Sequence, residues 1–452
     1  MGYYSPHTED EIRQMLSAIG LPSLEELFRA IPDKFRLKAG LNLAEGKPEP
    51  EVEQEIKSLS EQNLSCGRVK CFAGGGVYHH YVPRVVEYLA SRSEFSTAYT
   101  PYQPEASQGT LQAIFEFQTM VCELTGMEVA NASMYDGGEA CAEAVLMALR
   151  VARKDRGRIL LSSALHPHYQ RIIRTYTAHL DHPIELIPLL PSGELDLEKL
   201  KSREGICLVV QHPNYFGVLE QMPEIQKICQ EKDLILIVVV CEALSLAILE
   251  PPGKFGAGIV CGEAQSFGIR PSFGGPLLGF FASRMDWVRR MPGRLVGETT
   301  DRKGQRGYVL TLATREQHIR RAKATSNICT NHSLMALQAV IYLSLLGKNG
   351  LEKLAKANLE RGWYLRKKIE ASSELGLKFS GPNFNELVVE LGVSGEEATR
   401  ELIKDGILAG VPLTHHFPEL ENCLLVAVTE LVDKSDIELL VKKLEEISRK
   451  GK

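Results

Sequence analysis

Gln265 stands where this chain would need a lysine to perform one well-defined reaction. The local sequence is GEAQSFG (262–268). We predict a buried strand over Leu234–Cys241, a second strand over Gly258–Gly262 and a glycine-rich turn over Ser272–Pro276. Enzymes that hold pyridoxal phosphate as a Schiff base place a lysine just before such a turn, because only an amine condenses with the aldehyde. A glutamine amide cannot form that imine, so we expect half of an active site whose other half lies on another polypeptide.

Ser133–Glu139 is a turn at the N-terminus of a predicted helix and is a candidate for binding phosphate. The free N–H groups and the dipole of a helix N-terminus attract anions, and the glycines of this turn suit that role. Asp136 and Glu139 do not, because a carboxylate there competes with phosphate for the same donors. The pattern favours plain capping of the helix by Asp136.

Two other strand ends also differ from what pyridoxal chemistry requires. Cys241 follows the buried strand, where an aspartate would keep the pyridine nitrogen protonated, and a thiol is a poor partner for that charge. Glu242 would point to the opposite face if the strand continued. Val210–Gly217 resembles a pocket wall but is a weak signal alone. The other lysines of the region have the contexts of exposed side chains: Lys227, Lys232, Lys254 and Lys303.

Three polar or glycine-rich stretches each allow a structural and a functional interpretation. Cys71–His80 is either a flexible turn or a loop that lines a pocket with its His and Tyr side chains. Met291–Glu298 places Arg294 in a tight turn. Thr314–Asn331 is either a solvated helix face followed by a loop or a site that recognises a carboxylate or phosphate through Arg, Ser and Thr.

The elements that must position these residues alternate between strand and helix. The predicted strands are Ile159–Ser162, Ile184–Pro188, Ile206–Gln211 and Leu234–Cys241, and the helices between them are His166–Ala178, Leu195–Ser202 and Pro223–Glu231. Helices over Thr110–Thr125 and Glu139–Arg153 precede them. This spacing predicts an α/β fold with a parallel sheet covered by helices, and such sheets bind ligands at the carboxyl ends of their strands.

We predict three parts in the chain: an N-terminal helical segment (1–62), a large α/β domain (63–332) and a small C-terminal α+β domain (333–452). In the first part, capping boxes are predicted at Thr8–Glu11 and Ser23–Glu26, and a further helix over Pro48–Gln62. Another helix is expected over Pro83–Ser91, and Met291–Arg306 is expected to be a long ordered loop. Further helices are predicted over Thr314–Lys323, Ser333–Leu345, Gly350–Glu370, Gly395–Asp405 and Asp433–Ser448, and strands over Glu386–Leu391 and Leu424–Val428.

Composition argues against several classes of protein. The chain has 452 residues and a net charge of −5, with no strongly basic segment, which argues against nucleic-acid binding. The longest apolar run, Leu234–Cys241, is too short to span a bilayer, and the N-terminus is not a signal peptide. The ten cysteines are scattered and several lie in apolar stretches, as expected of reduced thiols in a cytoplasmic protein. Cys66 and Cys71 leave a disulfide or metal site as a weak alternative.

Four stretches resemble one family closely. They are RSEFSTAYTPYQPEASQGTLQAIFEFQTMVCELTGMEVANASMYDG (92–137), GEAQSFG (262–268), RMPGRLVGET (290–299) and TREQHIRRAKATSNICTN (314–331). Over essentially its whole length the chain is similar to the subunit 1 (alpha subunit) family of decarboxylating glycine dehydrogenase, the P protein of the glycine cleavage system. TPYQPE and KATSNICTN are the most specific motifs.

The resemblance implies a fold type I (aspartate-aminotransferase-like) structure and a heteromer, α2β2 in composition. The beta subunit holds pyridoxal 5'-phosphate on its lysine, and none is covalently bound to this chain. The complex decarboxylates glycine, releases CO2 and passes the aminomethyl group to the lipoyl arm of the H protein. The alpha subunit is expected to be inactive alone, to lie in the cytoplasm, and to have no metal, nucleic-acid or membrane partner.

The resemblance also implies that loops of this chain complete a pocket on the neighbouring subunit. The prolines of Tyr99–Pro104 should keep that stretch extended and stiff across an interface. The candidate pocket or interface residues are Tyr99, Thr100, Tyr102, Gln103, Gln108, Arg294, Arg315, Ser326, Asn327 and Thr330. Two other hypotheses stay open, a lone fold type I enzyme that uses an unrecognised lysine and a purely structural partner.

Overall fold

The computed structural model describes residues 7–37, 40–96, 99–152 and 157–451, which form two compact units, Met1–Leu64 and Ser65–Lys452. The beginning of the predicted N-terminal segment (1–6), two residues of the 92–137 motif (97–98) and the predicted end of a helix at Arg153 lie outside the described residues. The division between a large and a small domain at residue 332 stays a prediction.

The described residues of the N-terminal unit form two α-helices, both predicted. Helix α1 (Glu9–Ala18) begins with the expected capping box, in which the Thr8 hydroxyl accepts from the Glu11 N–H and the Glu11 carboxylate accepts from the Thr8 N–H. Helix α2 spans Glu49–Glu61. The second predicted capping box is wrong, because Ser23 makes no capping bond and Leu24–Phe28 (η1) is a 3₁₀ turn. So short a segment between prolines gains too few hydrogen bonds to form an α-helix.

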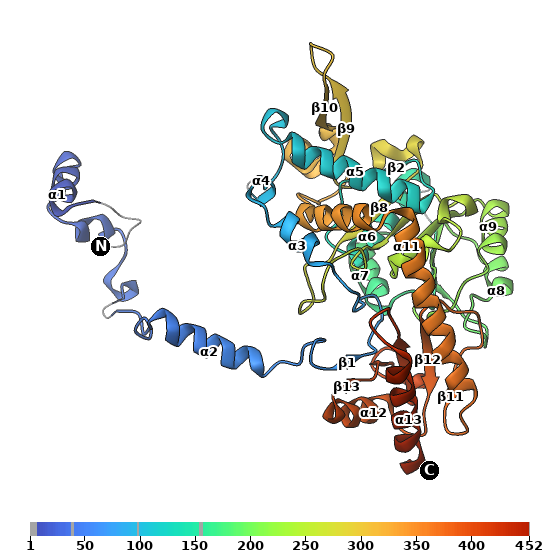
Figure 1. The fold of residues 1–452 in the computed structure, drawn as a ribbon. Helices are drawn as coiled ribbons and strands as arrows, with labels where there is room; N and C mark the ends of the chain where they lie inside the picture. The colour runs from blue at the N-terminus through green and yellow to red at the C-terminus, as the bar shows by residue number, and fades with distance from the viewer. Residues whose placement is uncertain (1–6, 38–39, 97–98, 153–156, 452) are drawn as a thin grey trace. The chain divides into compact units, whose positions relative to one another are not determined.

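The second unit is built on a seven-stranded sheet of order β2-β8-β7-β6-β5-β3-β4, of which β2 and β8 are labelled in Figure 1. Its strands are β2 (Val129–Ala130), β8 (Gly279–Ser283), β7 (Ile259–Glu263), β6 (Ile235–Val240), β5 (Cys207–Gln211), β3 (Ile159–Ser162) and β4 (Ile184–Ile187). The five strands from β7 to β4 pair in parallel, as predicted, whereas β8 is antiparallel to both of its neighbours. The carboxyl ends of the parallel strands therefore meet along one edge.

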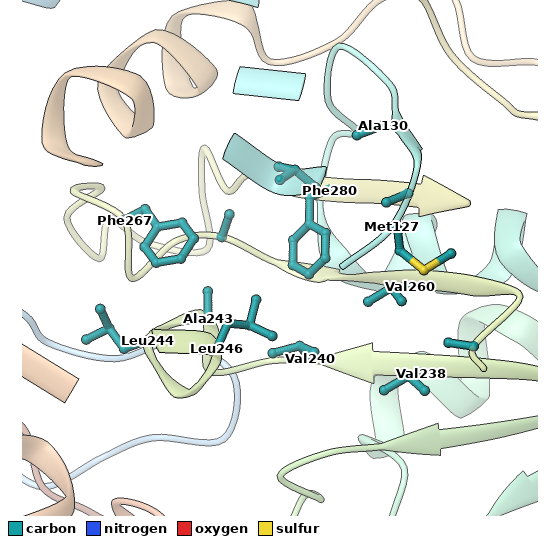
Figure 2. Close-up of a cluster of buried hydrophobic side chains, with 14 of the residues drawn as sticks. Met127, Ala130, Val238, Val240, Ala243, Leu244, Leu246, Val260, Phe267 and Phe280 are labelled. Atoms are coloured by element: carbon teal, nitrogen blue, oxygen red, sulfur yellow. The ribbon is translucent and has the colours of Figure 1, made fainter. Parts of the chain in front are cut away.

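Side chains of β6 alternate between two apolar cores, one on each face of the sheet. Val238 and Val240 belong to the first core, part of which is drawn in Figure 2, and Ile237 and Val239 belong to the second. A sheet buried on both faces has uniformly apolar strands, which explains the continuous run at 234–241. The helices that cover the faces include α5 (Gln108–Thr125), α6 (Gly137–Ala152), α7 (Pro167–Thr177), α8 (Leu197–Lys201) and α9 (Met222–Glu231).

Helix α11 (Ser333–Glu370) is kinked at Gly347, whose φ of 58° lies in the left-handed region, so the two predicted helices form one bent element. Among the described residues it is the one helix that is long and apolar enough to cross a membrane. Its side chains Ala336, Ala339, Val340 and Tyr342 are buried in the first core, so one face of the helix packs within the protein.

The stretch Met291–Arg306 is not the predicted loop. It contains strand β9 (Leu295–Thr300), which pairs antiparallel with β10 (Arg306–Thr311). The Asp301 carboxylate accepts from the N–H groups of Lys303 and Gln305, which closes the turn, and the β-branched and aromatic residues on either side suit strands. The polar composition of the turn obscured this hairpin. The predicted helix over Thr314–Lys323 is also broken, into η7 (Ala313–Arg315), α10 (Gln317–Arg320) and η8 (Arg321–Lys323).

The C-terminal part has a four-stranded antiparallel sheet of order β11-β12-β15-β14, with strands Gly376–Leu377, Glu386–Glu390, Cys423–Ala427 and Val411–Pro412. Helices α12 (Gly395–Leu402) and α13 (Lys434–Lys450) pack against it. A short parallel pair joins β1 (Lys70–Cys71) to β13 (Ile407–Leu408). The remaining helical elements are α3 (Arg84–Ala90), α4 (Ser93–Ser96), η2 (Asp33–Phe35), η3 (Pro104–Ala106), η4 (Ala243–Ala247), η5 (Pro252–Phe255), η6 (Met285–Arg290), η9 (Ile403–Asp405) and η10 (Pro418–Leu420).

Candidate functional site

The Gln265 side chain is buried just beyond β7 and bonds to the backbone through both ends of its amide. Its amide nitrogen donates to the carbonyls of Tyr78 (3.1 Å) and Ile269, and its amide oxygen accepts from the Tyr78 N–H (2.9 Å). Both amide donors are therefore used within the protein, and the oxygen already has one partner. Gln265 therefore fastens the glycine-rich segment 71–80 to the carboxyl edge of the sheet.

A carboxylate of this chain occupies the place where an anion would bind. At the N-terminus of α6, the Gly137 N–H donates to Glu263 (3.0 Å) and the Glu139 N–H donates to Asp136 (2.8 Å), as the capping interpretation predicted. Glu263 also accepts from the N–H groups of Gln265 and Leu278. Burial raises the pKa of Glu263 to about 7, although the Leu278 and Gly137 N–H groups oppose that shift. Two donors of the helix end, the N–H groups of Gly137 and Glu139, are thus already paired with carboxylates of the protein.

The cleft at this strand edge has a volume of about 480 Å³ and is lined by histidines and tyrosines. The His166 ring stacks on Tyr169 at 4.6 Å and faces Tyr215 edge-on at 4.9 Å. His168 and His416 approach each other with their Nε2 atoms 3.1 Å apart. Within the described residues no group of three His, Cys, Asp or Glu side chains is placed to hold a metal ion. All ten cysteines are free, so Cys66 and Cys71 form no disulfide.

These residues do not fit a pyridoxal phosphate bound to this chain. In place of the imine-forming amine stands the Gln265 amide, which is hydrogen-bonded to the backbone. Glu263 and Asp136 fill the anion position. Cys241 follows β6 as a buried thiol whose pKa is raised by burial. Two carboxylates facing a phosphate would repel it. The carboxyl edge of this sheet therefore offers neither the amine nor the anion-binding position that pyridoxal phosphate would need.

Buried charges hold the segment 71–80 from its other side. His80 lies between Glu242 (Nε2 to Oε2, 3.1 Å) and Glu430 (Nδ1 to Oε2, 2.8 Å). Burial opposes a charge on His80, but Glu242 and Glu430 outweigh it and raise the pKa to about 10. Glu386 accepts from the Gly75 N–H and the Tyr78 hydroxyl, and burial raises its pKa to about 8. The loop is thereby tied to both the large sheet and the C-terminal sheet.

Three predicted site residues meet in a second cluster. The Arg294 guanidinium, 4 % exposed, donates to the Tyr102 hydroxyl (3.1 Å), to the Thr330 hydroxyl (3.2 Å) and to the Cys329 carbonyl. It lies 5.3 Å over the Tyr102 ring and 3.6 Å from Glu316. Arg294 therefore supports its neighbours, whereas the Tyr102 side chain stays 48 % exposed.

Two more candidates are bound within the protein. Arg315 is buried and donates to the carbonyls of Met291, Gly293 and Leu312, which fixes the turn that carries Arg294. The Ser326 hydroxyl donates to Glu143 at 2.8 Å. Both side chains contribute to the local fold.

The remaining candidates lie near the surface. Gln108 bonds to both backbone groups of Tyr308 and so joins the start of α5 to β10. Tyr99, Gln103 and Asn327 are exposed, and Thr100 is half-buried. The Thr100 carbonyl accepts from the Tyr102 N–H at 2.8 Å, so this proline-rich stretch contains a tight turn and, contrary to our expectation, is not extended throughout. The exposed side chains of Tyr99, Gln103 and Asn327 can therefore contact another molecule.

Sequence reasoning missed the carboxylates that organise the site. Glu263 precedes Gln265 by two residues and points to the same edge, and this spacing was the signal that could have found it. Glu386, Glu430 and His80 are far apart in the sequence, and their meeting depends on how the C-terminal sheet packs. Glu242 is correctly placed after β6, but the strand ends at Val240 and its carboxylate caps η4 through the Leu244 N–H.

Comparison with known proteins identifies the family. The family model of the glycine cleavage system P-protein matches residues 3–444. The "probable glycine dehydrogenase (decarboxylating) subunit 1" of Carboxydothermus hydrogenoformans is 49% identical over 98% of this chain and 99% of its own length. The protein of the same name from Geobacillus thermodenitrificans is 48% identical over 98% of both chains.

Solved structures agree with this result. A crystal structure of glycine decarboxylase (P-protein) of the glycine cleavage system, in inhibitor-bound form, is 42% identical, with a TM-score of 0.88 over 99% of this chain and all of that one. A Lactobacillus brevis glutamate decarboxylase, 13% identical with a TM-score of 0.68 over 93% of this chain and 96% of its own, shares the fold alone. The chain has the expected fold type I architecture, and it belongs to the glycine cleavage system P-protein family.

Proposed function

We propose that this chain is the cofactor-free subunit of a two-subunit glycine decarboxylase, and that pyridoxal phosphate is held by its partner subunit. Two residues together carry this proposal. Gln265 stands where the imine-forming lysine would be and is bonded to Tyr78, and Glu263 accepts from the Gly137 N–H where an anion would bind. The high identity to proteins named subunit 1 supports the same assignment.

The partner subunit supplies pyridoxal phosphate and the lysine amine that holds it, and glycine loses CO2 on that subunit. In this proposal the assembly is α2β2 and cytoplasmic, and the aminomethyl group passes to the lipoyl arm of the H protein. This chain orients groups at the interface and excludes water there. The exposed Tyr102 ring, held by Arg294, and the neighbouring Tyr99, Gln103 and Asn327 are the side chains that we assign to that contact.

The isolated chain is expected to form no covalent adduct with pyridoxal phosphate. Borohydride reduction followed by peptide mapping measures this directly, and co-purified partner subunit provides the positive control. A stoichiometric adduct on any lysine of this chain would favour a lone enzyme. Glycine decarboxylation by this chain without a partner would contradict the proposal in the same way.

Tyr102→Phe is expected to lower glycine decarboxylation by the assembled complex about tenfold, with cofactor content and assembly unchanged. The change removes the acceptor of a hydrogen bond from a cation, a bond worth about 1.5–3 kcal/mol, and so releases the ring from Arg294.

Tyr88→Phe is the matched control, since Tyr88 is also exposed, lies on α3 and is not among the residues that contact Arg294. Equal rates in the Tyr102→Phe and wild-type complexes would show that Tyr102 has no part in activity. A weaker complex would instead assign the residue to assembly.

A further inference from the structure

Positive charge is concentrated in one segment of this chain, which corrects the expectation from composition that no segment is strongly basic. Arg284–Lys323 contains eleven Lys and Arg residues and four Asp and Glu residues, a net charge of +7 in a chain whose total is −5. The segment runs from η6 through the β9–β10 hairpin to η8. Such segregation within one stretch creates a local field that attracts anions.

Part of this segment folds into a pocket. A hollow of about 330 Å³ is lined by Arg289, Arg290, Leu312, Thr314, Arg315, Arg320 and Thr325. No acidic residue lies among these lining residues. Arg315 is the buried part of the wall, and its guanidinium is already bonded to three carbonyls. The pocket thus combines a fixed cation with hydroxyl groups and further cations at its rim.

Three of the lining cations are available to a ligand. Arg289, Arg290 and Arg320 are exposed, and in the described part of the chain none of their side chains forms an ion pair or hydrogen bond. Arg294, by contrast, faces Glu316 and is buried. The arginines of this segment that can bind an anion are therefore not Arg294 and Arg315, the two candidates named from the sequence.

The backbone around the pocket is also held in an unusual conformation. Leu312 lines the pocket with φ at 53°, and Arg321 follows Arg320 with φ at 54°. Non-glycine residues adopt this region at a cost of about 1–3 kcal/mol and concentrate at functional sites. Here the conformation places elements from two sides of the segment around one hollow.

We propose that Arg289, Arg290 and Arg320 form a binding site for a phosphate group carried by a small molecule. Each guanidinium offers a planar fork that matches phosphate oxygens, and Thr314 and Thr325 add neutral donors. A phosphate dianion offsets more of this charge than a single carboxylate does. The volume leaves room for a phosphate and a small organic group. This site is separate from the strand-edge cleft and does not depend on the proposed function.

Titration calorimetry of the full chain with inorganic phosphate and pyrophosphate tests the site, with succinate as the carboxylate arm and ionic strength held constant. We expect saturable binding of one phosphate or pyrophosphate per chain, and weaker binding of succinate. Arg290→Gln and Arg320→Gln should each weaken binding about tenfold or more. Unchanged melting temperatures would show that these surface variants remain folded.

Arg302→Gln is the matched control, because Arg302 is an exposed arginine of the same basic segment in the hairpin turn, outside the pocket. It should leave phosphate binding within about twofold of wild type. Equal weakening by all three variants would overturn the site in favour of a diffuse charge effect. Absence of saturable binding, or tighter binding of succinate than of pyrophosphate, would also overturn it.

Discussion

His80→Ala is expected to lower the free energy of unfolding of this chain by about 3–5 kcal/mol, because it removes one partner from a buried ionic network. Glu242, 3 % exposed, and the more accessible Glu430 would then face each other without the imidazolium that separates them. Chemical denaturation followed by circular dichroism measures the loss. A change below about 1 kcal/mol would contradict the assigned network.

His79→Ala is the matched control for this experiment. His79 is the adjacent histidine, and its ring forms no hydrogen bond with the described residues, while burial lowers its pKa. Its replacement should cost much less than that of His80. Comparable losses would mean that backbone disturbance of the loop, and not the charge network, is being measured.

The same network fixes a direction of pH dependence. Because the pKa of His80 is raised from 6.5 to about 10, its contribution to stability is complete below pH 6.5 and is lost as the pH rises through 10. The pKa of Glu430 falls from 4.5 to about 2, since His80 outweighs the effect of burial, so its contribution is lost as the pH falls through 2. The difference between wild type and His80→Ala should therefore be largest between pH 4.5 and 6.5.

Gln265→Lys is expected to destabilise the chain without restoring cofactor binding. The lysine would lose the bonds that Gln265 makes to Tyr78 and Ile269 and would bring an ammonium into a buried site. Unsatisfied buried groups cost about 1–3 kcal/mol each, so we expect a loss of at least about 2 kcal/mol. No imine absorbance should follow addition of pyridoxal phosphate, because Glu263 still holds the Gly137 N–H.

Gln265→Met separates the two effects, because it removes the hydrogen bonds at similar volume without adding a charge. We expect it to destabilise the chain less than Gln265→Lys does. Stoichiometric imine formation by Gln265→Lys alone, detected by absorbance and borohydride trapping, would show that Glu263 does not block the anion position.

The five parallel strands of the large sheet were predictable because each carries a local signal, whereas the antiparallel strands β2 and β8 were not predicted. Strands such as Ile159–Ser162 are short apolar runs between helices with clear periodicity, and burial on both faces requires that pattern. The β9–β10 hairpin was not predicted because its strands contain charged and glycine residues, so the pairing is decided by contacts to α5 and the Asp301 turn. Tertiary contacts outweigh local composition in such a case.

The site was predictable only where a single residue type decides the chemistry. Gln265 excludes an imine by its functional group alone, without knowledge of its surroundings. Arg294 shows the opposite case, because an arginine in a glycine turn can face a ligand or support a fold. Only the positions of Tyr102, Thr330 and Glu316 around it show that its two terminal nitrogens are already hydrogen-bonded and its charge is already faced by a carboxylate. Burial of that kind arises from residues distant in sequence.

The parallel pairing of β1 with β13 has a consequence for how the protein is made. Lys70, Phe72 and Gly75 bond to Gly406, Leu408 and Glu386, so the early glycine-rich loop is positioned by residues near the end of the chain. During synthesis on the ribosome these bonds stay unmade until most of the polypeptide has emerged, although the bonds from Tyr78 to Gln265 can form earlier. Contacts between residues so distant in sequence form slowly. The strand-edge cleft, which is also lined by His415 and His416, therefore cannot be complete until that part of the chain is available, and polypeptides truncated before residue 406 would never close it.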